Sequence, residues 1–183
     1  MKTSEFIAGF FDSIENGIRS IDRKKLEQSA SIIFEKRESG KKIIIVGNGG
    51  SAAMASHVAV DFTKAAGIRA INFNEADLIT CFANDYGYEH WVSKALEAYA
   101  DEGDIVFLIS SSGKSQNIVN AALTAREMGV YVITVSGFSS SNPLRALGDI
   151  DLWVDSYEYN IVEMTHHIWL LAIVELLILE KQI

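Results

Sequence analysis

The sequence predicts an α/β protein in which five parallel strands form a sheet flanked by helices. Short apolar segments rich in Ile and Val alternate along the chain with longer segments of helical periodicity. This alternation is typical of βαβ units, whose right-handed crossovers make neighbouring strands parallel and place helices against the sheet. The 183 residues are enough for one core, and no linker or low-complexity tract divides them, so we expect a single domain over residues 1–183.

The N-terminal region predicts a helical extension ahead of the first strand. Apolar residues recur at roughly helical spacing between residues 4 and 38, and a break near residues 20–23 divides the region in two. Ser39 and Gly40 end the second helix, because glycine readily adopts the left-handed conformation that follows a helix. The apolar positions are Phe6, Ile7, Phe10, Ile14, Ile18, Ile21, Leu26, Ile32 and Ile33.

The remaining elements follow in alternation. Each expected strand is a short run of mostly apolar residues, and each expected helix is bounded by glycines or polar loops. The strands are expected at residues 43–46, 68–73, 105–109, 131–135 and 150–154. The helices are expected at residues 52–66, 77–83, 88–100, 116–128 and 161–180.

Two of the expected strands lead directly into a turn rich in Gly and Ser and then into a helix. The first turn is Gly-Asn-Gly-Gly-Ser at residues 47–51, and the second is Ser-Ser-Ser-Gly-Lys-Ser at residues 110–115. Such a turn directs backbone N–H groups, hydroxyls and the positive end of a helix toward one point, which is how proteins hold a phosphate. Two such turns, with no obvious site for an adenine, predict a small phosphorylated ligand.

The first turn also fits a dinucleotide-binding pattern. Residues 47–52 match G-x-G-x-x-A between a strand and a helix, and Glu75 could serve as the acidic residue after the next strand. Against a nicotinamide cofactor, Ser51 lies inside the fingerprint and a dinucleotide site does not need the second hydroxyl-rich turn. This interpretation therefore remains an alternative.

The second turn imitates the end of a nucleotide-binding P-loop. Its Gly-Lys-Ser at residues 113–115 fits that motif, but Leu108 occupies the place of the required first glycine. Nucleotide hydrolysis is therefore disfavoured. A flexible polar loop is the remaining interpretation, although such loops rarely connect a buried strand so tightly to a helix.

The composition argues against several classes of function. The net charge of −8 disfavours a nucleic-acid surface, which needs clustered Lys and Arg. The single cysteine, Cys81, excludes an intrachain disulfide and fits a reducing cytosol, and its apolar neighbours predict that it is buried. The N-terminal residues lack the long apolar region of a signal peptide, so we expect a cytoplasmic protein.

The apolar segment at residues 168–179 raises the question of a membrane span. It is shorter than the ~20 residues that a span requires, and it contains Glu175. We therefore expect a core helix or a subunit-interface helix, and no membrane. Because one small domain cannot cover a helix that is apolar on nearly all sides, we also expect a homo-oligomer.

Four motifs together resemble the SIS (sugar isomerase) domain family, and within it the phosphoheptose isomerases. They are the first turn, Asn-Asp-Tyr-Gly at residues 84–87, the second turn with Ile109 before it, and Ile-Val-Glu at residues 161–163. The resemblance covers essentially the whole chain. It implies a flavodoxin-like five-stranded sheet, a homotetramer and active sites at subunit interfaces.

The resemblance also implies how a phosphorylated sugar is bound. The phosphate is expected at the hydroxyls of four serines, with Ser111 nearby and with the backbone of Gly49 and Gly50 in the same turn region. Asn48 and Asp85 match positions that contact sugar hydroxyls. The four serines are Ser51, Ser110, Ser112 and Ser115.

The chain departs from this family at the residues expected to perform the chemistry. The histidine and catalytic glutamate that the family carries on the helix after the first turn are here His57 and Asp61, whose i, i+4 spacing keeps them on one face. On the closing helix, the family's Gln and catalytic His fall on Val162 and Leu170. His166 lies between these two positions on roughly the same face and is our candidate substitute, whereas His167 points about 100° away.

These departures leave two functions open. The first is an aldose–ketose isomerase of sedoheptulose 7-phosphate or a related sugar phosphate, which transfers protons through an enediol with Asp61 as base and His166 or His57 as acid. No cofactor is required, but a zinc ion bound by His57, Asp61 and His166 is chemically plausible. The second is a non-catalytic sugar-phosphate sensor or scaffold, resembling the family member that associates with the bacterial replication initiator.

Overall fold

A computed structural model describes residues 3–180 and contains one sheet of five strands. The strand order is β2-β1-β3-β4-β5 and every neighbouring pair is parallel, so the flavodoxin-like arrangement is confirmed. The strands are β1 (Ile43–Val46), β2 (Ala70–Asn72), β3 (Ile105–Ser110), β4 (Tyr131–Ser136) and β5 (Ile150–Trp153).

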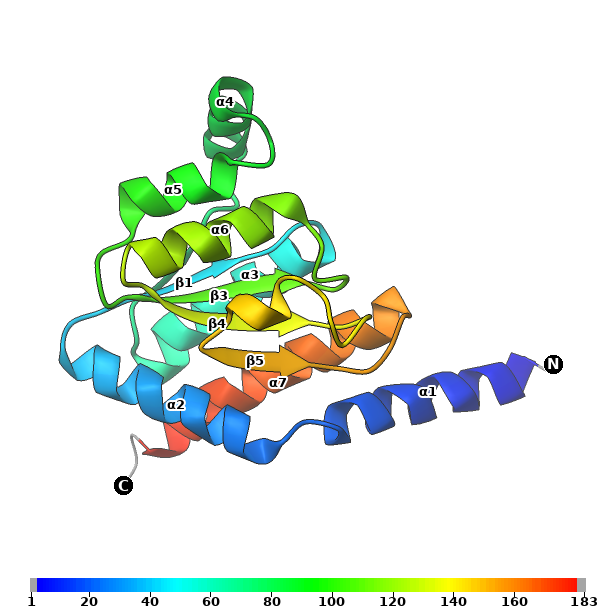
Figure 1. Cartoon of the computed structure of the whole chain (residues 1–183). Helices are drawn as coiled ribbons and strands as arrows, with labels where there is room; N and C mark the ends of the chain where they lie inside the picture. Colours follow the sequence, from blue (N-terminus) through cyan, green and yellow to red (C-terminus); the bar gives the residue numbers. More distant parts are fainter. Residues whose placement is uncertain (1–2, 181–183) are drawn as a thin grey trace.

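Helices cover both faces of this sheet (Figure 1). One apolar core lies between the sheet and α2, α3 and α7, and a second lies between the sheet and α5 and α6. The α-helices are α1 (Thr3–Arg19), α2 (Arg23–Glu38), α3 (Gly50–Asp61), α4 (Ala76–Tyr86), α5 (Trp91–Tyr99), α6 (Gln116–Glu127) and α7 (Tyr159–Glu180). A π-helical turn, η1 (Phe62–Ala66), follows α3, and a 3-10 turn, η2 (Arg145–Leu147), precedes β5.

Most predicted boundaries hold to within a few residues, and the differences have local causes. β2 is shorter than expected because Ile68 belongs to the turn that Gly67 opens in the left-handed conformation. The helix expected at residues 52–66 begins earlier, at Gly50, and changes to a π-helical turn at Phe62. Such turns are rare and often occur at functional sites, and this one follows directly on Asp61.

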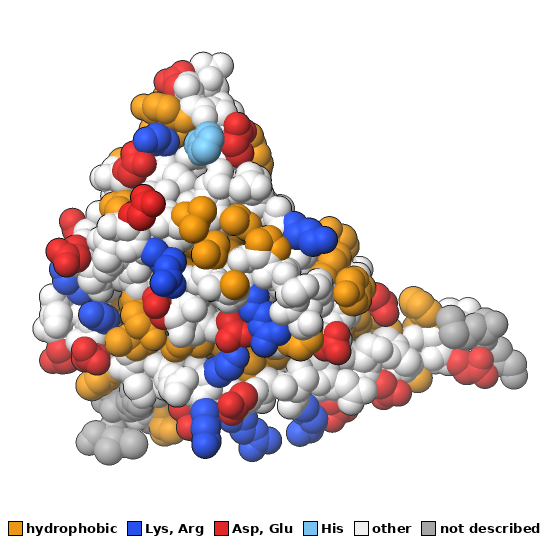
Figure 2. Space-filling view, in the orientation of Figure 1, with side chains coloured by type: hydrophobic (Ala, Val, Ile, Leu, Met, Phe, Trp, Pro, Cys, Tyr) orange, Lys and Arg blue, Asp and Glu red, His pale blue; other side chains and the backbone are white. Residues whose placement is uncertain are grey.

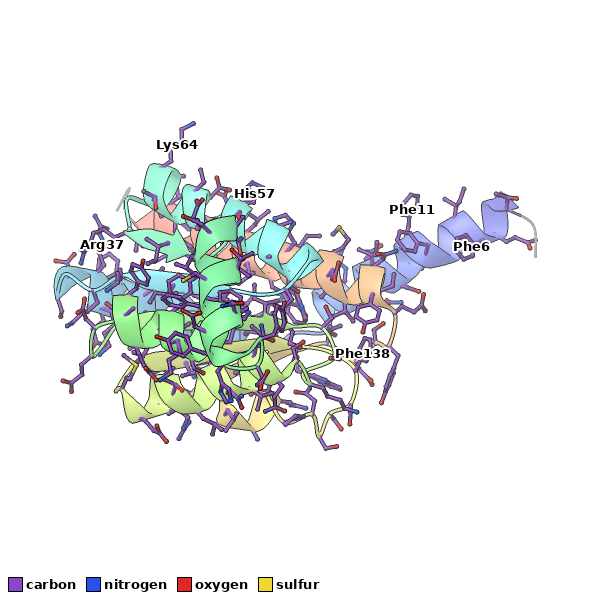
Figure 3. The ribbon with its side chains drawn as sticks, turned by 90° about the horizontal axis from the view of Figure 1, so that it is seen from above. Phe6, Phe11, Arg37, His57, Lys64 and Phe138 are labelled. Carbon is purple, nitrogen blue, oxygen red and sulfur yellow. The ribbon has the colours of Figure 1, made fainter. Side chains whose placement is uncertain are left out.

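The first helix extends away from the sheet as an arm (Figure 1). Its inner part packs against α7, where Gly17 lies against Thr165. Farther out, Phe6 and Phe11 are largely exposed, and Figure 3 shows both on the arm. An amphipathic helix whose aromatic face meets water has apolar surface available for a partner.

The closing helix is longer than expected. α7 spans 22 residues, so by length and composition it could cross a membrane, contrary to our reason for excluding a span. Half of the most apolar part of this helix is buried inside the protein, where it packs against the sheet and α1, α2 and α3. This packing is typical of the core helix of a folded domain.

The prediction that Cys81 is buried was wrong. Cys81 lies on α4, which stands away from the sheet (Figure 1) and contains no buried residue. Its thiol is exposed, with Sγ 3.9 Å from Oδ2 of Asp85. The apolar neighbours Ile79 and Phe82 are only partly buried and pack against the edge of the second core, whereas Cys81 faces away from it.

Candidate functional site

The two Gly/Ser-rich turns meet at the carboxyl edge of the sheet, where β1 and β3 are neighbours. The chain crosses from one side of β1 to the other at this point, which is where flavodoxin-like sheets bind ligands. A reciprocal pair of amide hydrogen bonds joins the turns: Asn48 Nδ2 donates to Asn117 Oδ1 over 3.0 Å, and Asn117 Nδ2 donates to Asn48 Oδ1 over 2.9 Å. The hydroxyl of Tyr88 also donates to Asn48 Oδ1, at 3.0 Å.

The serine loop, residues 110–115, has the features of an anion site. Ser110 and Ser111 are buried, the Ser110 and Ser115 hydroxyls are 3.0 Å apart, and Ser115 is the N-cap of α6. Gly113 has a φ of +65°, and the place of a Cβ there is filled by the side chain of Asn142. The loop therefore brings hydroxyls to the positive end of a helix in a conformation that requires glycine.

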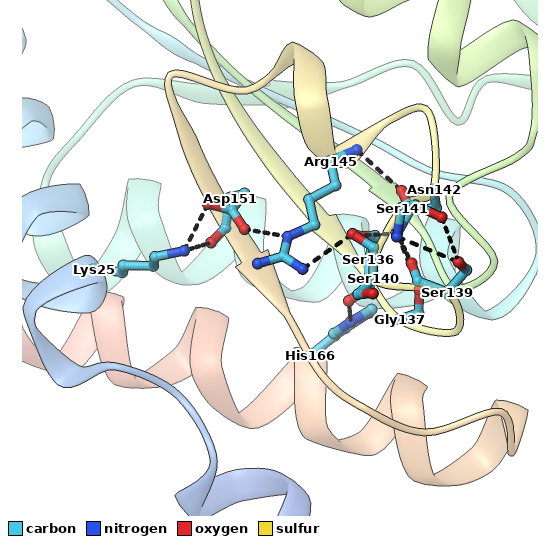
Figure 4. A network of polar contacts seen from close by, with 10 residues as sticks. All are labelled: Lys25, Ser136, Gly137, Ser139, Ser140, Ser141, Asn142, Arg145, Asp151 and His166. Atoms are coloured by element: carbon cyan, nitrogen blue, oxygen red, sulfur yellow. Dashed lines mark hydrogen bonds and ion pairs between the residues drawn. The ribbon is translucent and has the colours of Figure 1, made fainter.

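The loop after β4 contacts the serine loop and is held by hydrogen bonds of its own, which Figure 4 shows. Asn142 Nδ2 donates to Ser136 Oγ and to the carbonyl oxygens of Gly137 and Ser139. The Gly137 N–H donates to the Ser111 carbonyl oxygen. The Leu144 N–H also donates to the Gly113 carbonyl oxygen, so two backbone hydrogen bonds join the loop after β4 to the serine loop.

The first turn, residues 47–51, has a different environment. Gly49 has a φ of +56°, and Ser51 is buried in the first turn of α3. Gly50 is covered by Glu163 of α7, whose carboxylate lies where a Cβ of residue 50 would be. A Cβ at position 50 would therefore have to displace this carboxylate.

A second group of polar residues, which we call the His57 cluster, consists of His57, Asp61 and His167. His57 Nε2 lies 3.3 Å from Asp61 Oδ2, and His57 Nδ1 lies 2.9 Å from His167 Nε2, with the two rings edge to face. Burial, and then the neighbouring His57, lower the pKa of His167, against the opposing effect of the Asp61 carboxylate. The cluster is a connected chain of a carboxylate and two imidazoles, suited to moving protons.

The sequence pattern of the SIS domain family matches residues 9–137. The chain belongs to the SIS domain family. The phosphoheptose isomerase of Helicobacter hepaticus is 39% identical over 133 residues, which are 69% of this chain and 67% of that protein. That of Hamiltonella defensa is 34% identical over 168 residues, 87% of this chain and 81% of that protein.

A solved structure extends the similarity to three dimensions. The phosphoheptose isomerase from Francisella tularensis superimposes with a TM-score of 0.90 at 26% identity, over 99% of this chain and 100% of that chain. The similarity therefore includes the start of α1 and the whole of α7, which lie outside the matched SIS domain pattern.

The structure does not bring His166 together with His57 and Asp61. The side chain is completely buried, and its Nε2 lies 3.0 Å from the Ser136 carbonyl oxygen (Figure 4). His166 shares a face of α7 with Val162 and Leu170, as the spacing predicted, but this face packs into the core. The adjacent residue, His167, contacts His57 instead.

The zinc site of His57, Asp61 and His166 is therefore not assembled in the part of the chain that the structure describes. No group of three or more His, Cys, Asp or Glu side chains within residues 3–180 is arranged to hold a metal ion. His57 directs one ring nitrogen to His167 and the other to Asp61, so neither nitrogen is left for a metal in this arrangement.

Asp85 lies at the end of α4 rather than in a loop. Its side chain is exposed and accepts a hydrogen bond from Asn84 over 2.9 Å. Tyr88, which follows the helix, reaches Asn48 in the first turn. The segment after α4 therefore connects to the first turn through Tyr88, and the predicted role of Asp85 stays a prediction.

Sequence reasoning missed four residues of this site. His167 was set aside because its direction differs from that of Val162, and Glu163 was used only as part of a motif. Asn117 and Tyr88 carried no motif, but an Asn in the first turn of a helix that follows a Ser-rich loop is a signal that could have been used. The partners of these residues are distant in sequence, so spacing did not indicate them.

Proposed function

We propose that this protein is an aldose–ketose isomerase of a phosphorylated sugar, of the phosphoheptose isomerase type. The observation that carries the proposal is the serine loop, a preformed anion site at the crossover of a SIS-domain sheet. Identities of 33–39% to phosphoheptose isomerases support the reaction class. The substrate is sedoheptulose 7-phosphate or a related sugar phosphate.

In the proposed reaction, the serine loop holds the phosphate and thereby orients the far end of the sugar. Asp61 removes a proton from C1 of the ketose, and the carbonyl oxygen on C2 takes up a proton, which gives an enediol. Return of a proton to C2 and loss of the hydroxyl proton on C1 give the aldose. His57, linked to His167, supplies and recovers the hydroxyl protons.

The two parts of this site come from different subunits in our proposal. Ser51 and Asp61 are separated by about 15 Å along α3, at 1.5 Å per residue. The His57 cluster lies on a surface with exposed apolar side chains, Val60, Met164 and Ile168, which favours cover by another subunit. A homotetramer in which one subunit's cluster faces another subunit's serine loop satisfies both observations.

The reaction is tested by assaying purified protein with sedoheptulose 7-phosphate and a panel of pentose and hexose phosphates. Turnover of at least one of them is expected. Absence of turnover across the panel, with sugar-phosphate binding retained, would favour a sensor or scaffold. Val162 and Leu170 support that alternative, because both are apolar and buried where the family resemblance implies Gln and His.

Ser112→Ala tests the phosphate site. The Ser112 hydroxyl accepts a hydrogen bond from the Lys114 N–H at 3.3 Å and retains its proton for a ligand oxygen. Loss of one charge-assisted hydrogen bond is expected to weaken sugar-phosphate binding about tenfold by calorimetry. Ser139→Ala, in the loop after β4, is the control, and equal affinities for the wild type and Ser112→Ala would remove Ser112 from the site.

The proposed assembly makes a separate prediction. A groove of about 580 Å³ between α1, α2 and α7 is lined by apolar side chains, among them Phe11, Ile14 and Trp169. Light scattering should give about 81 kDa, four chains of 20.2 kDa each. Phe11→Asp should shift the protein to species smaller than a tetramer. Leu123→Asp, on α6 at the opposite face of the sheet, is the control and should leave the mass unchanged. A monomeric wild type would contradict the proposal.

The remaining properties follow from the same proposal. We place the protein in the cytoplasm, with no required cofactor, and we expect no direct nucleic-acid partner. Acidic and basic side chains are intermingled on the face that Figure 2 shows, without a continuous basic patch. Surfaces that bind nucleic acid concentrate Lys and Arg on one face.

A further inference from the structure

Glu163 places an unpaired carboxylate in front of the first turn. A Cβ built on Gly50 would lie 2.4 Å from Glu163 Oε2 and 3.1 Å from Oε1, so the carboxylate packs directly on the backbone at the start of α3. Glu163 is half-buried, and its carboxylate makes no hydrogen bond or ion pair with any residue that the structure describes. Its acceptor oxygens are available to a ligand.

This carboxylate distinguishes two turns that look alike in sequence. A phosphate at the first turn would lie within a few ångströms of Glu163, and like charges at such a distance repel each other strongly when partly shielded from water. The serine loop carries no acidic residue and includes Lys114. The phosphate therefore goes to the serine loop, and a pyrophosphate at Gly49 and Gly50 is disfavoured.

A carboxylate without a partner accepts hydrogen bonds from neutral donors, and its two oxygens can accept from two neighbouring hydroxyls at once. Asn48, in the same turn as Gly50, adds an amide, and Tyr88 adds a hydroxyl that contacts it. The group that fits this environment is the hydroxyl-bearing part of a sugar, not an anion.

We propose that Glu163 determines specificity by accepting hydrogen bonds from hydroxyls of the sugar whose phosphate is held by the serine loop, and that residue 50 is glycine so that this carboxylate can enter the site. The inference rests on the proposed function. It adds hydroxyl recognition to the first turn and keeps the phosphate next to the serine loop.

The test is calorimetric titration with sedoheptulose 7-phosphate and, separately, with inorganic phosphate. Glu163→Gln keeps the shape of the side chain but replaces one acceptor oxygen by a donor. We expect at least about tenfold weaker binding of the sugar phosphate, with inorganic phosphate binding unchanged or tighter because a negative charge is removed. Glu175→Gln, the same change at an exposed site on the same helix, should alter neither affinity.

Gly50→Ala provides a second variant, because its Cβ displaces the Glu163 carboxylate without removing it. It should weaken sugar-phosphate binding as Glu163→Gln does, and the double variant should be no weaker than the worse single variant. Thermal unfolding of each variant establishes that it is folded before titration.

The outcomes separate this inference from the proposed function. If Glu163→Gln lowers the affinity for both ligands equally, Glu163 only supports the structure. If it lowers neither affinity, the carboxylate does not contact the sugar. Either result overturns the inference and leaves the proposed function intact. If the wild type binds inorganic phosphate but no sugar phosphate of the panel, the proposed function and the inference fall together.

Discussion

Asp61→Asn is expected to lower kcat by at least about 100-fold, because the amide keeps the shape of the side chain but cannot take a proton from carbon. In our proposal the serine loop, and not Asp61, holds the phosphate, so the affinity for the sugar phosphate should change little. Steady-state kinetics together with calorimetry on the same variant measure both quantities. A fall in affinity without a fall in kcat would assign Asp61 to binding instead.

Two further variants test the length of the side chain at position 61 and the part played by His167. Asp61→Glu restores the longer side chain that the family resemblance implies, and it should retain activity or raise it if the shorter side chain limits proton transfer. His167→Asn should lower kcat less than Asp61→Asn does, because His167 acts through His57, whose Nδ1 is 2.9 Å from His167 Nε2. An effect of His167→Asn as large as that of Asp61→Asn would show that His167 itself reaches the substrate.

The second large effect concerns acid stability. Complete burial lowers the pKa of His166 from 6.5 to about 4, partly offset by the hydrogen bond to the Ser136 carbonyl oxygen. The folded-state pKa is below the unfolded one, so as the pH falls below about 6.5 the unfolded chain takes up a proton that the folded protein does not. The free energy of unfolding should therefore fall by about 3 kcal/mol between pH 6.5 and 4 from this residue alone.

His166→Gln isolates this contribution, since the glutamine amide can still donate to the Ser136 carbonyl oxygen but does not titrate. Urea unfolding at a fixed protein concentration, at pH 7, 6, 5 and 4, gives the free energy of unfolding of the wild type and of the variant. Relative to the wild type, the free energy of unfolding of the variant should rise by about 3 kcal/mol as the pH falls. A difference that stays constant over this range would show that His166 becomes protonated in the folded protein.

Local sequence was sufficient to predict much of the fold and the position of the two Gly/Ser-rich turns. The apolar runs that begin at Ile43 and Ile105 predicted two strands of a parallel sheet, and the structure shows that these strands are neighbours. The break between the first two helices was also correct, with α1 ending at Arg19 and α2 beginning at Arg23. These features depend on residues close together in the chain, where spacing and turn chemistry dominate.

The exposure of Cys81 could not be predicted in this way. The apolar residues around it are compatible with a buried helix, but α4 projects from the sheet and buries none of its residues. Similarly, the two Gly/Ser-rich turns look equivalent in sequence, yet the Glu163 carboxylate packs on Gly50 in the first and the Asn142 amide packs on Gly113 in the second. Both differences depend on which distant segment lies nearby.

The sequence by itself determined which residues of α7 share a face: the 3.6-residue period places Val162, His166 and Leu170 together, and the structure confirms it. It did not determine that this face enters the core while His167 turns toward His57. A helix with apolar side chains on nearly all sides has no polar face to direct it, so local sequence leaves its rotation about its own axis undetermined. Packing against the sheet and α3 set that rotation, and with it decided which histidine contacts His57.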